Sequence, residues 1–229
     1  MNDVPRILGI IPARGGSKGV PRKNVRCVAG KPLIGYTIEA AQGASRLSRV
    51  VVSTEDAEIS AVARACGVEV LPRPVDLAAD DTPGIAPVLH AMEQMSEYDY
   101  VVLLQPTSPL RTALDIDAAI ETCMSAQAPA CVSVSEAAQS PYWMFRIEAG
   151  GKMQPLLSAS ADEYSRRQNV PPAYALNGAV YVAVTDWLRE RQTFLTSETV
   201  AYTMPQERSL DIDSEWDFLI FGLVLEKKP

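Results

Sequence analysis

Near its N-terminus the chain reads Ile7-Leu-Gly-Ile-Ile-Pro-Ala-Arg-Gly-Gly-Ser-Lys-Gly-Val-Pro-Arg-Lys-Asn24. The apolar run up to Ile11 is too short for a helix and ends at Pro12, so it predicts a buried strand. Successive N–H groups in the glycine turn that follows form an anion-binding concavity. Four cations in that turn add attraction for a polyphosphate, namely Arg14, Lys18, Arg22 and Lys23. The stretch predicts a strand leading into a triphosphate cradle, with a solvated surface turn as the alternative.

Two better-known phosphate-binding motifs do not fit these glycines. A Walker A loop requires G-x-x-x-x-G-K-[ST], and neither Gly15 nor Gly16 is followed by a glycine five positions later. The dinucleotide motif G-x-G-x-x-G fails because Ser17 stands two positions after Gly15. A cradle at this turn therefore belongs to neither of these classes.

The composition indicates one sizeable domain. The chain has 229 residues, of which 47% are hydrophobic. Lys and Arg number 21 against 28 Asp and Glu, giving a net charge of −7. A chain this acidic is a poor candidate for binding nucleic acid or an anionic membrane. The N-terminal cations therefore form a local positive site on a negative body.

Other features of the composition bear on location and chemistry. We expect no signal peptide and no membrane span, because no charged start precedes an apolar segment and no apolar run approaches ~20 residues. The single histidine, His90, excludes a His-rich zinc site and disfavours a Ser-His-Asp triad, so a metal here would be a hard cation on carboxylates. Four scattered cysteines are expected to be small core hydrophobes in a reducing cytoplasm: Cys27, Cys66, Cys123 and Cys131.

Strand-like and helical patterns alternate through the first 135 residues. Helices are expected over 33–44, 55–66, 85–97 and 115–126, and strands over 49–54, 68–71, 100–104 and 130–135. This order predicts an α/β fold with parallel strands and helices on both faces of the sheet. The Pro- and Asp-rich segment 72–83 follows a strand, and such loops are where ligands bind in open α/β sheets.

The pattern changes from about residue 138. Segments 141–147 and 152–157 predict a hairpin turning at Gly150-Gly151, and 165–172 predicts an extended arm. Strands return at 181–184 and 200–204, with a short helix beginning at Trp187 between them. Ser214 and Asp217 have capping-box spacing at the start of a C-terminal helix. Its apolar residues are expected to pack on the sheet: Phe218, Leu219, Phe221 and Leu225.

Asp211 and Asp213 flank Ile212 just before that last helix. In an extended segment, residues two apart point the same way, so both acids would face one side while Ile212 enters the core. Two carboxylates together with phosphate and water oxygens suit Mg²⁺. A helix-capping pair at the surface is the alternative, but a cationic phosphate loop in the same chain favours the metal.

Three further polar groups have less specific patterns. Gln105-Pro-Thr-Ser-Pro-Leu-Arg111 offers an amide, two hydroxyls and a guanidinium at the end of a strand, which suits a polyhydroxylated or carboxylate ligand; an ordinary βα connection is the alternative. Arg166-Arg167-Gln168 could bind an acid or be solvated. Asn177-Gly178 could be a tight turn.

Taken together, these groups resemble the CMP-N-acylneuraminate (sialic acid) cytidylyltransferases over nearly the whole chain. The resemblance lies in the order and context of seven segments: Ile11-Pro-Ala-Arg-Gly-Gly-Ser-Lys-Gly with Pro21-Arg-Lys-Asn24, Val51-Val-Ser-Thr54, Arg73-Pro74, Gln105 to Arg111, Arg167-Gln168, Asn177-Gly-Ala-Val-Tyr181 and Asp211-Ile-Asp213. It implies a Rossmann-like three-layer sandwich of the nucleotide-diphospho-sugar transferase type, with a mostly parallel mixed sheet. It also implies a homodimer in which an inserted segment, roughly 138–178, reaches the partner.

The same resemblance implies a role for each candidate site residue. CTP would be bound by Ala13, Arg14, Gly15, Lys18, Lys23, Asn24, Arg73, Asp81 and Thr82, with the triphosphate on Arg14, Lys18 and Lys23. The sugar acid would be bound by Gln105, Thr107, Ser108, Arg111, Arg167, Gln168, Asn177 and Tyr181, with Arg167 serving the partner's site. The catalytic set would be Arg14, Lys23, Asp211 and Asp213, the two acids carrying Mg²⁺.

The implied reaction is attack of the sugar's anomeric hydroxyl on the α-phosphorus of CTP, with loss of pyrophosphate. The substrate choice stays open between N-acylneuraminate and legionaminate, because Pro141-Tyr-Trp-Met lacks a lysine and Ala175 replaces an arginine of some relatives. A cytidylyltransferase for KDO or pseudaminic acid, and a non-catalytic nucleotide-binding homologue, are the alternatives. None of the expected acids or loop cations is missing, which disfavours the non-catalytic homologue.

Overall fold

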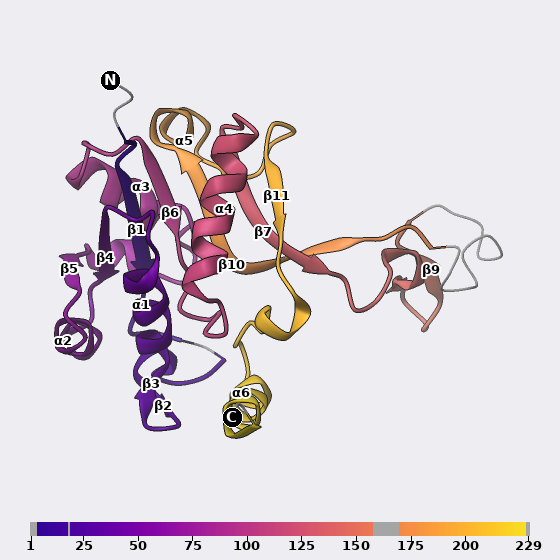
Figure 1. The fold of residues 1–229 in the computed structure, drawn as a ribbon. Helices are drawn as coiled ribbons and strands as arrows, with labels where there is room; N and C mark the ends of the chain where they lie inside the picture. The colour runs from indigo at the N-terminus through magenta and orange to yellow at the C-terminus, as the bar shows by residue number, and fades with distance from the viewer. Residues whose placement is uncertain (1–3, 18, 158–169, 228–229) are drawn as a thin grey trace.

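A sheet of seven strands crosses the part of the chain that this computed structural model describes, residues 4–17, 19–157 and 170–227 (Figure 1). Its order is β11-β7-β10-β6-β1-β4-β5. The strands are β1 (Ile7–Pro12), β4 (Arg49–Thr54), β5 (Glu69–Pro72), β6 (Tyr100–Leu103), β7 (Ala130–Glu136), β10 (Tyr174–Val184) and β11 (Val200–Thr203). Neighbouring strands pair in parallel except at β10, which is antiparallel to both β6 and β7. The predicted mostly parallel mixed sheet is confirmed.

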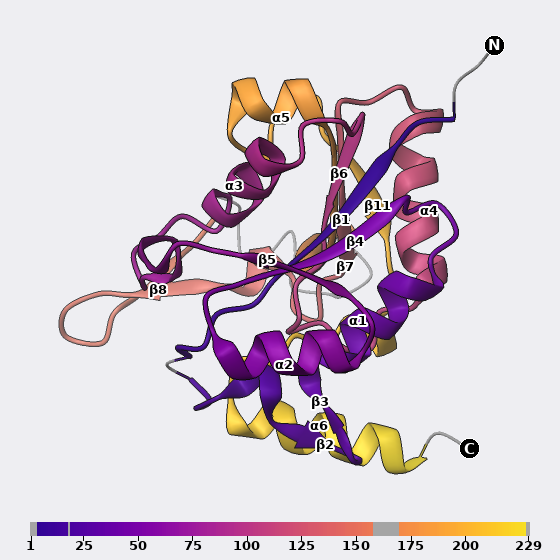
Figure 2. The same ribbon diagram turned by 90° about the vertical axis from the view of Figure 1, so that its left-hand side faces the viewer.

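Helices cover both faces of this sheet, which makes three layers (Figure 2). On one face lie α1 (Leu33–Gly43), α2 (Ala57–Ala65) and α4 (Ala113–Ser125), and on the other α3 (Ala86–Gln94) and α5 (Thr185–Arg191). The residues of β1 alternate between the two cores, Ile7 and Ile11 entering one and Leu8 and Ile10 the other. Because side chains alternate along a strand, a fully apolar run is the pattern of a strand buried on both faces.

The C-terminal helix α6 (Glu215–Lys227) begins as predicted but packs elsewhere. Ser214 and Asp217 form the reciprocal capping box, with the Ser214 N–H donating to Asp217 Oδ2 at 2.8 Å and the Asp217 N–H to Ser214 Oγ at 3.3 Å. The helix packs in a small separate core beside the hairpin β2 (Cys27–Val28) and β3 (Lys31–Pro32). The expectation that it packs on the sheet was wrong, and Leu219 remains 52% exposed.

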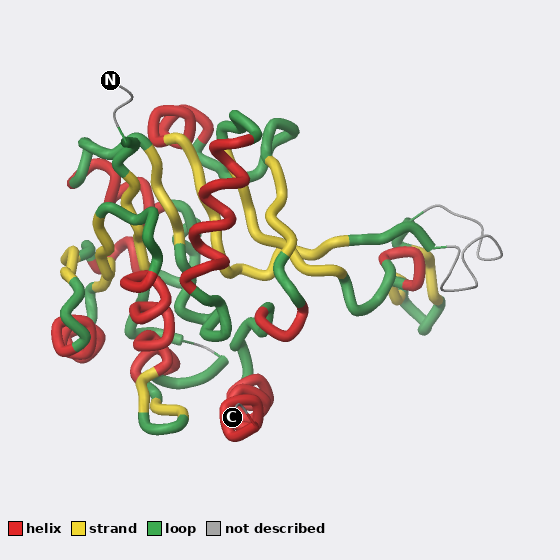
Figure 3. Tube along the Cα trace, in the orientation of Figure 1, coloured by secondary structure: helices red, strands yellow, loops and turns green. Residues whose placement is uncertain are grey.

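The segment expected to be an insertion stands out from the body of the molecule (Figure 3). It carries the hairpin β8 (Phe145–Ile147) and β9 (Met153–Pro155), and β10 returns from it into the sheet. β10 is longer than expected, since it begins at Tyr174. The reason is that Asn177-Gly178 is an irregularity inside the strand, where the register with β7 shifts and Gly178 has φ +71°, rather than a turn between elements.

The four cysteines differ in burial. Cys123 and Cys131 are buried as expected, and burial raises the pKa of the Cys123 thiol to about 11. Cys27 is exposed on the β2 edge, which corrects the expectation that it lies in the core. Among the described residues, no helix is both long and apolar enough to cross a membrane.

Candidate active site

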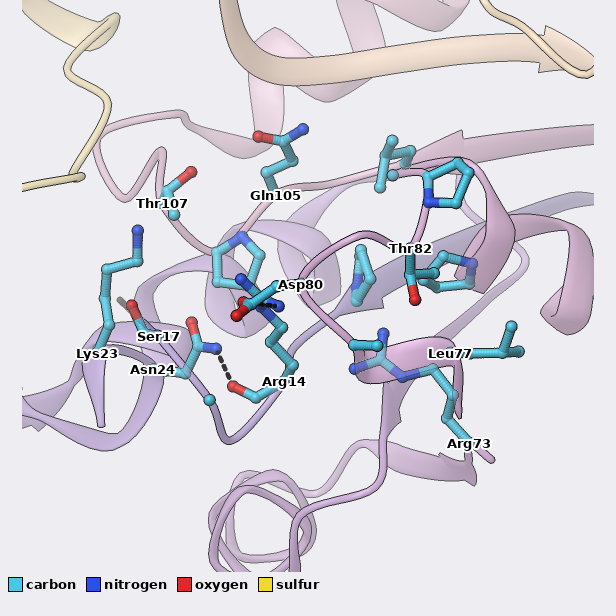
Figure 4. Close-up of a pocket in the computed structure, with 18 residues that line it drawn as sticks. Arg14, Ser17, Lys23, Asn24, Arg73, Leu77, Asp80, Thr82, Gln105 and Thr107 are labelled. Atoms are coloured by element: carbon cyan, nitrogen blue, oxygen red, sulfur yellow. Dashed lines mark hydrogen bonds and ion pairs between the residues drawn. The ribbon is translucent and has the colours of Figure 1, made fainter. Parts of the chain in front are cut away.

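A pocket of about 290 Å³ opens at the carboxyl ends of the central parallel strands (Figure 4). Its lining comes from the loop after β1, the loop after β5 and the turn after β6. Ligands bind at this edge of open α/β sheets because the connecting loops of several strands converge there. Seven of the predicted site residues line it: Arg14, Lys23, Asn24, Arg73, Thr82, Gln105 and Thr107.

Two of the four loop cations line the pocket. The Nη1 atom of Arg14 lies 2.8 Å from Asp80 Oδ1 and donates to the Ala78 carbonyl at 3.2 Å. Lys23 Nζ donates to the Ile212 carbonyl at 2.6 Å and to Asp213 Oδ1 at 3.0 Å. The loop and the acidic pair, about 190 residues apart in the chain, therefore share a hydrogen bond.

The other two loop cations are not among the described residues that line the pocket. Arg22 does not line the pocket and pairs with acids at the start of α2, with Nη1 2.6 Å from Asp56 Oδ2 and Nη2 bonded to Glu58. That pairing lowers the pKa of Asp56 to about 2. Lys18 lies outside the described residues.

Close packing requires a glycine at one position of the loop. A Cβ at Gly19 would lie 2.2 Å from the carbonyl oxygen of Asp213, so only glycine lets the loop touch the acidic segment. The Gly15 N–H donates to Glu55 Oε1 at 2.7 Å. Neither Gly15 nor the buried Ala13 lines the pocket.

The pocket lining also presents an amide and a guanidinium, whereas Asp211 and Asp213 do not belong to it. The Nδ2 group of Asn24 donates to the carbonyl of Arg14 at 3.0 Å, which ties the loop to the segment that follows it. Arg73 Nη2 donates to Glu55 Oε2 at 2.7 Å. Thr82 lines the pocket while its hydroxyl donates to the Asp76 carbonyl at 3.0 Å, and Asp81 does not line it.

The acidic pair is arranged as predicted around a buried Ile212. The N–H of Ile212 donates to the Thr107 carbonyl at 2.8 Å, which fixes the segment to the turn after β6. Burial raises the pKa of Asp211, the Thr107 hydroxyl lowers it, and the charge of Asp213 raises it again, with a net rise. Two acids that repel one another are a donor set a divalent cation would stabilise. No group of three or more metal-binding side chains occurs in the described ranges, so a cation here needs ligand oxygens as well.

Gly178 lies close to both Asp211 and the turn after β6. A Cβ there would lie 3.0 Å from Gln105 Oε1 and 3.8 Å from Asp211 Oδ2. Burial, and secondarily the charge of Asp211, raise the pKa of Tyr181. Gln105 and Asp211 therefore lie close together at Gly178, and Gln105 also lines the pocket.

Three predicted sugar ligands instead form the scaffold beneath the pocket. Asn177 accepts from Ser133 Oγ at 2.6 Å and donates to Ser209 Oγ at 3.0 Å, and Ser108 donates to the Asn177 carbonyl at 3.3 Å. Arg111 is buried and donates through Nη1 to the carbonyls of Ala179 at 2.7 Å and Gln105 at 3.2 Å. Burial lowers the pKa of Arg111 to about 9. The structure places all three away from the pocket lining, whereas Arg167 and Gln168 lie outside the described residues.

Sequence reasoning missed two residues at this site, Ser17 and Glu55, and expected Asp80 only as part of the ligand-binding segment 72–83. Ser17 and Asp80 line the pocket, and Glu55 joins two of its loops. Glu55 and Asp56 were both expected to open α2, but only Asp56 caps it, accepting from the N–H groups of Glu58 and Ile59 at 3.0 and 2.9 Å. The usable signal for Glu55 is its place directly after a strand that ends at the ligand-binding edge.

Comparison with known proteins identifies the class. Residues 8–213 match the family model described as cytidylyltransferase, so the chain belongs to the cytidylyltransferase family. It is 36% identical over 228 residues to the CMP-N,N'-diacetyllegionaminic acid synthase of Legionella pneumophila, covering 96% of this chain and 97% of that protein. It is 32% identical over 223 residues to the N-acylneuraminate cytidylyltransferase of Escherichia coli O18:K1:H7. The resemblance drawn from the motifs is confirmed.

The relatives differ in length, and the fold is shared more widely. The match covers 97% of this chain but 53% of the Escherichia coli relative, so the chain spans about half the length of that protein. A solved structure of a CMP:2-keto-3-deoxy-manno-octonic acid synthetase complexed with CTP superposes with a TM-score of 0.75, covering 97% of this chain and 99% of that one. At 16% identity this likeness concerns the fold alone.

Proposed function

We propose that the chain transfers CMP from CTP to the anomeric hydroxyl of a sialic-type nonulosonic acid, releasing pyrophosphate. The carrying observation is the contact of Lys23 with Asp213, which brings a cationic phosphate loop against an acidic pair at the ligand-binding edge. Family membership supports CTP as the nucleotide, and the names of the Legionella and Escherichia coli relatives support legionaminate or N-acylneuraminate as acceptor. The KDO, pseudaminate and non-catalytic alternatives are not favoured by these relatives.

In this proposal the pocket works by positioning and charge neutralisation. Arg14 and Lys23 bind the triphosphate, which replaces the carboxylates that they contact in the free chain. Asn24 and Arg73 bind the ribose and cytosine, while Gln105 and Tyr181 orient the sugar acid. The hydroxyl oxygen attacks the α-phosphorus, the bond to the β-phosphate oxygen breaks, and pyrophosphate leaves. Little covalent help is needed for such a displacement.

Mg²⁺ is the cofactor that this site fits. Asp211 and Asp213 would hold it, since two carboxylates completed by phosphate and water oxygens match its preferred ligands. The bound ion would neutralise charge that develops on the phosphates. Burial, and after it the charge of Asp213, raise the pKa of Asp211, and a bound cation would favour the ionised carboxylate, which supports this assignment.

We further propose a homodimer formed through the arm, and a cytoplasmic location. The described part of the arm exposes large apolar side chains out of proportion to its size, and such surfaces mark interaction sites: Trp143, Met144, Phe145, Ile147, Met153, Leu156 and Leu157. CTP is a cytoplasmic nucleotide, which supports the location.

The test is a turnover assay with purified protein, CTP, Mg²⁺ and a panel of acceptors comprising N-acetylneuraminate, legionaminate, pseudaminate and KDO. Pyrophosphate release with one of the first two is expected, and with CTP in preference to UTP. Release only with KDO or pseudaminate would overturn the acceptor assignment. CTP binding without release for any acceptor would favour the non-catalytic homologue.

A further inference from the structure

Glu55 lies at the ends of three adjacent parallel strands. It directly follows β4, which pairs with β1 on one side and with β5 on the other. Its Oε1 atom accepts the Gly15 N–H at 2.7 Å, and its Oε2 atom accepts from Arg73 Nη2 at 2.7 Å. A single carboxylate thus joins the loop after β1 to the loop after β5.

This junction is buried and ionised. The Arg73 and Glu55 side chains are 3% and 13% exposed. Burial alone would raise the pKa of Glu55, but the hydrogen bonds from Arg73 and from the Gly15 N–H outweigh it and hold the pKa below its usual value. Both oxygens are engaged by donors from different loops, so the carboxylate has a fixed orientation.

The position of Glu55 is electrostatically unfavourable for binding phosphate at the glycine loop. Glu55 takes one N–H group from the glycine loop and adds a negative charge beside the position expected for the triphosphate. Its pairing with Arg73 offsets that charge and fixes the guanidinium at the pocket wall. Arg73 Nε is buried and has no hydrogen-bond partner within the described ranges, so the contact with Glu55 leaves one donor of the guanidinium unsatisfied.

We propose that Glu55 is a positioning residue for CTP, which sets the spacing between the loop that binds the phosphates and the arginine that contacts the nucleoside. The proposal rests on the function proposed above and deepens it. Nucleotides whose base or phosphates do not match this spacing would bind less well. The acceptor sugar, bound on the far side by Gln105 and Tyr181, would be indifferent to Glu55.

The test compares Glu55→Gln with Glu58→Gln. The first variant keeps the shape and an oxygen for the Gly15 N–H but removes the charge that holds Arg73. Glu58 is exposed, lies three residues further on and pairs with Arg22 outside the pocket. With Mg²⁺ and no acceptor, we expect the CTP Kd of Glu55→Gln to rise about tenfold and that of Glu58→Gln to stay within about twofold, by calorimetry. The KM for the sugar acid is expected to stay within about twofold in both.

A double-mutant cycle separates positioning from a general structural role. If Glu55 acts through Arg73, adding Glu55→Gln to Arg73→Gln should weaken CTP binding by less than about twofold more. Additive losses would overturn the proposal. Glu55→Asp, which keeps the charge but shortens the reach, is a second variant if Glu55→Gln folds poorly. Wild-type CTP affinity in either folded variant would also overturn it.

The outcomes distinguish this proposal from the function on which it rests. A wild-type chain that binds CTP but releases no pyrophosphate with any acceptor would overturn the function and leave the Glu55 comparison standing. Glu55 variants that bind CTP normally in an active enzyme would overturn only the positioning role. A wild-type chain that does not bind CTP would overturn both.

Discussion

The nucleotide end and the sugar end of the site are built differently. At the nucleotide end, one chain supplies a lined pocket in which cations and amides are fixed by neighbouring carboxylates and carbonyls, as Arg14 is by Asp80 and Arg73 by Glu55. At the proposed sugar end, three polar residues of the matching motifs, Ser108, Arg111 and Asn177, are buried and hydrogen-bond to other parts of the chain. What remains for a ligand there is Gln105, Thr107 and Tyr181.

This difference indicates that the proposed nucleotide end needs one chain, whereas the proposed sugar end needs a second chain as well. At the proposed nucleotide end, the described ranges of one chain bring five of the predicted CTP-binding residues into one pocket. Among the described residues predicted to bind the sugar acid, the only cation is the buried Arg111, which fits the proposal that an arm from a partner completes this end. Substitutions can therefore act on one end while leaving the other unchanged.

Replacing Asp211 by Asn is expected to have the largest effect, because this acid adjoins both ends. It should lower kcat by about 10²–10³-fold through loss of Mg²⁺ at the reacting phosphate, with the fold intact. Pyrophosphate release at saturating Mg²⁺ measures this. Glu215→Gln, an exposed acid four residues on, is the control and should stay within about twofold. A wild-type rate for Asp211→Asn would refute the metal assignment.

Lys23→Ala should affect the nucleotide end alone. Loss of a charged donor to the phosphates is expected to raise the CTP Kd by about 10–100-fold without changing the KM for the sugar acid beyond about twofold. Lys31→Ala, which removes an equal charge paired with Glu39 on the surface, is the matched control. Unchanged CTP affinity after Lys23→Ala would argue against the cradle.

Ile147→Asp should affect the sugar end by way of assembly. This residue is 75% exposed on the arm, and a buried charge at a dimer contact costs about 2 kcal/mol or more. We expect the variant to become monomeric by light scattering and its turnover to fall about tenfold at low protein concentration, while CTP still binds. Leu114→Asp, at a 77% exposed apolar position on α4, serves as control. A monomeric wild type, or a dimeric and fully active Ile147→Asp, would remove the arm from the site.

Arg111→Ala should change stability rather than binding. It leaves a cavity and two orphaned carbonyls, so we expect the free energy of unfolding to fall by about 3 kcal/mol in urea titrations while the sugar KM stays within about twofold. Gln105→Ala should do the reverse, raising that KM about tenfold with little loss of stability. A raised KM for the sugar acid in a stable Arg111→Ala protein would instead support the predicted role of Arg111 in binding the sugar acid.

Much of the fold could be predicted because the local sequence patterns of its strands and helices are each compatible with only one kind of element. Apolar runs such as Val50 to Val52 fit only strands buried on both faces, and the Ser214–Asp217 spacing fits a helix start. The path of β10 could not be read in this way. Asn177-Gly178 has turn chemistry, yet pairing with β7 keeps it inside a strand.

For the site, charge patterns located the pocket but not the partners of each charge. Arg22 and Arg14 belong to the same cationic turn. Arg14 lines the pocket, whereas Arg22 pairs with Asp56, and only the three-dimensional position of Asp56 explains that difference. Arg111 has the composition of a surface residue, and its burial depends on carbonyls from β10, about 70 positions away. Long-range contacts decided these cases, and no local spacing encodes them.

The direction of β10 has a consequence for how the molecule is made. On each side of it lie parallel strands, β6 with β1 and β4 on one side and β7 with β11 on the other. While the chain emerges from the ribosome, β7 has no sheet partner until residues after 174 arrive, since both of its neighbours come later in the chain. Unpaired edges of this kind invite association with other chains. The growing polypeptide therefore passes through a stage in which β5, β4, β1 and β6 can already pair while β7 has no partner, until β10 joins β7 to them.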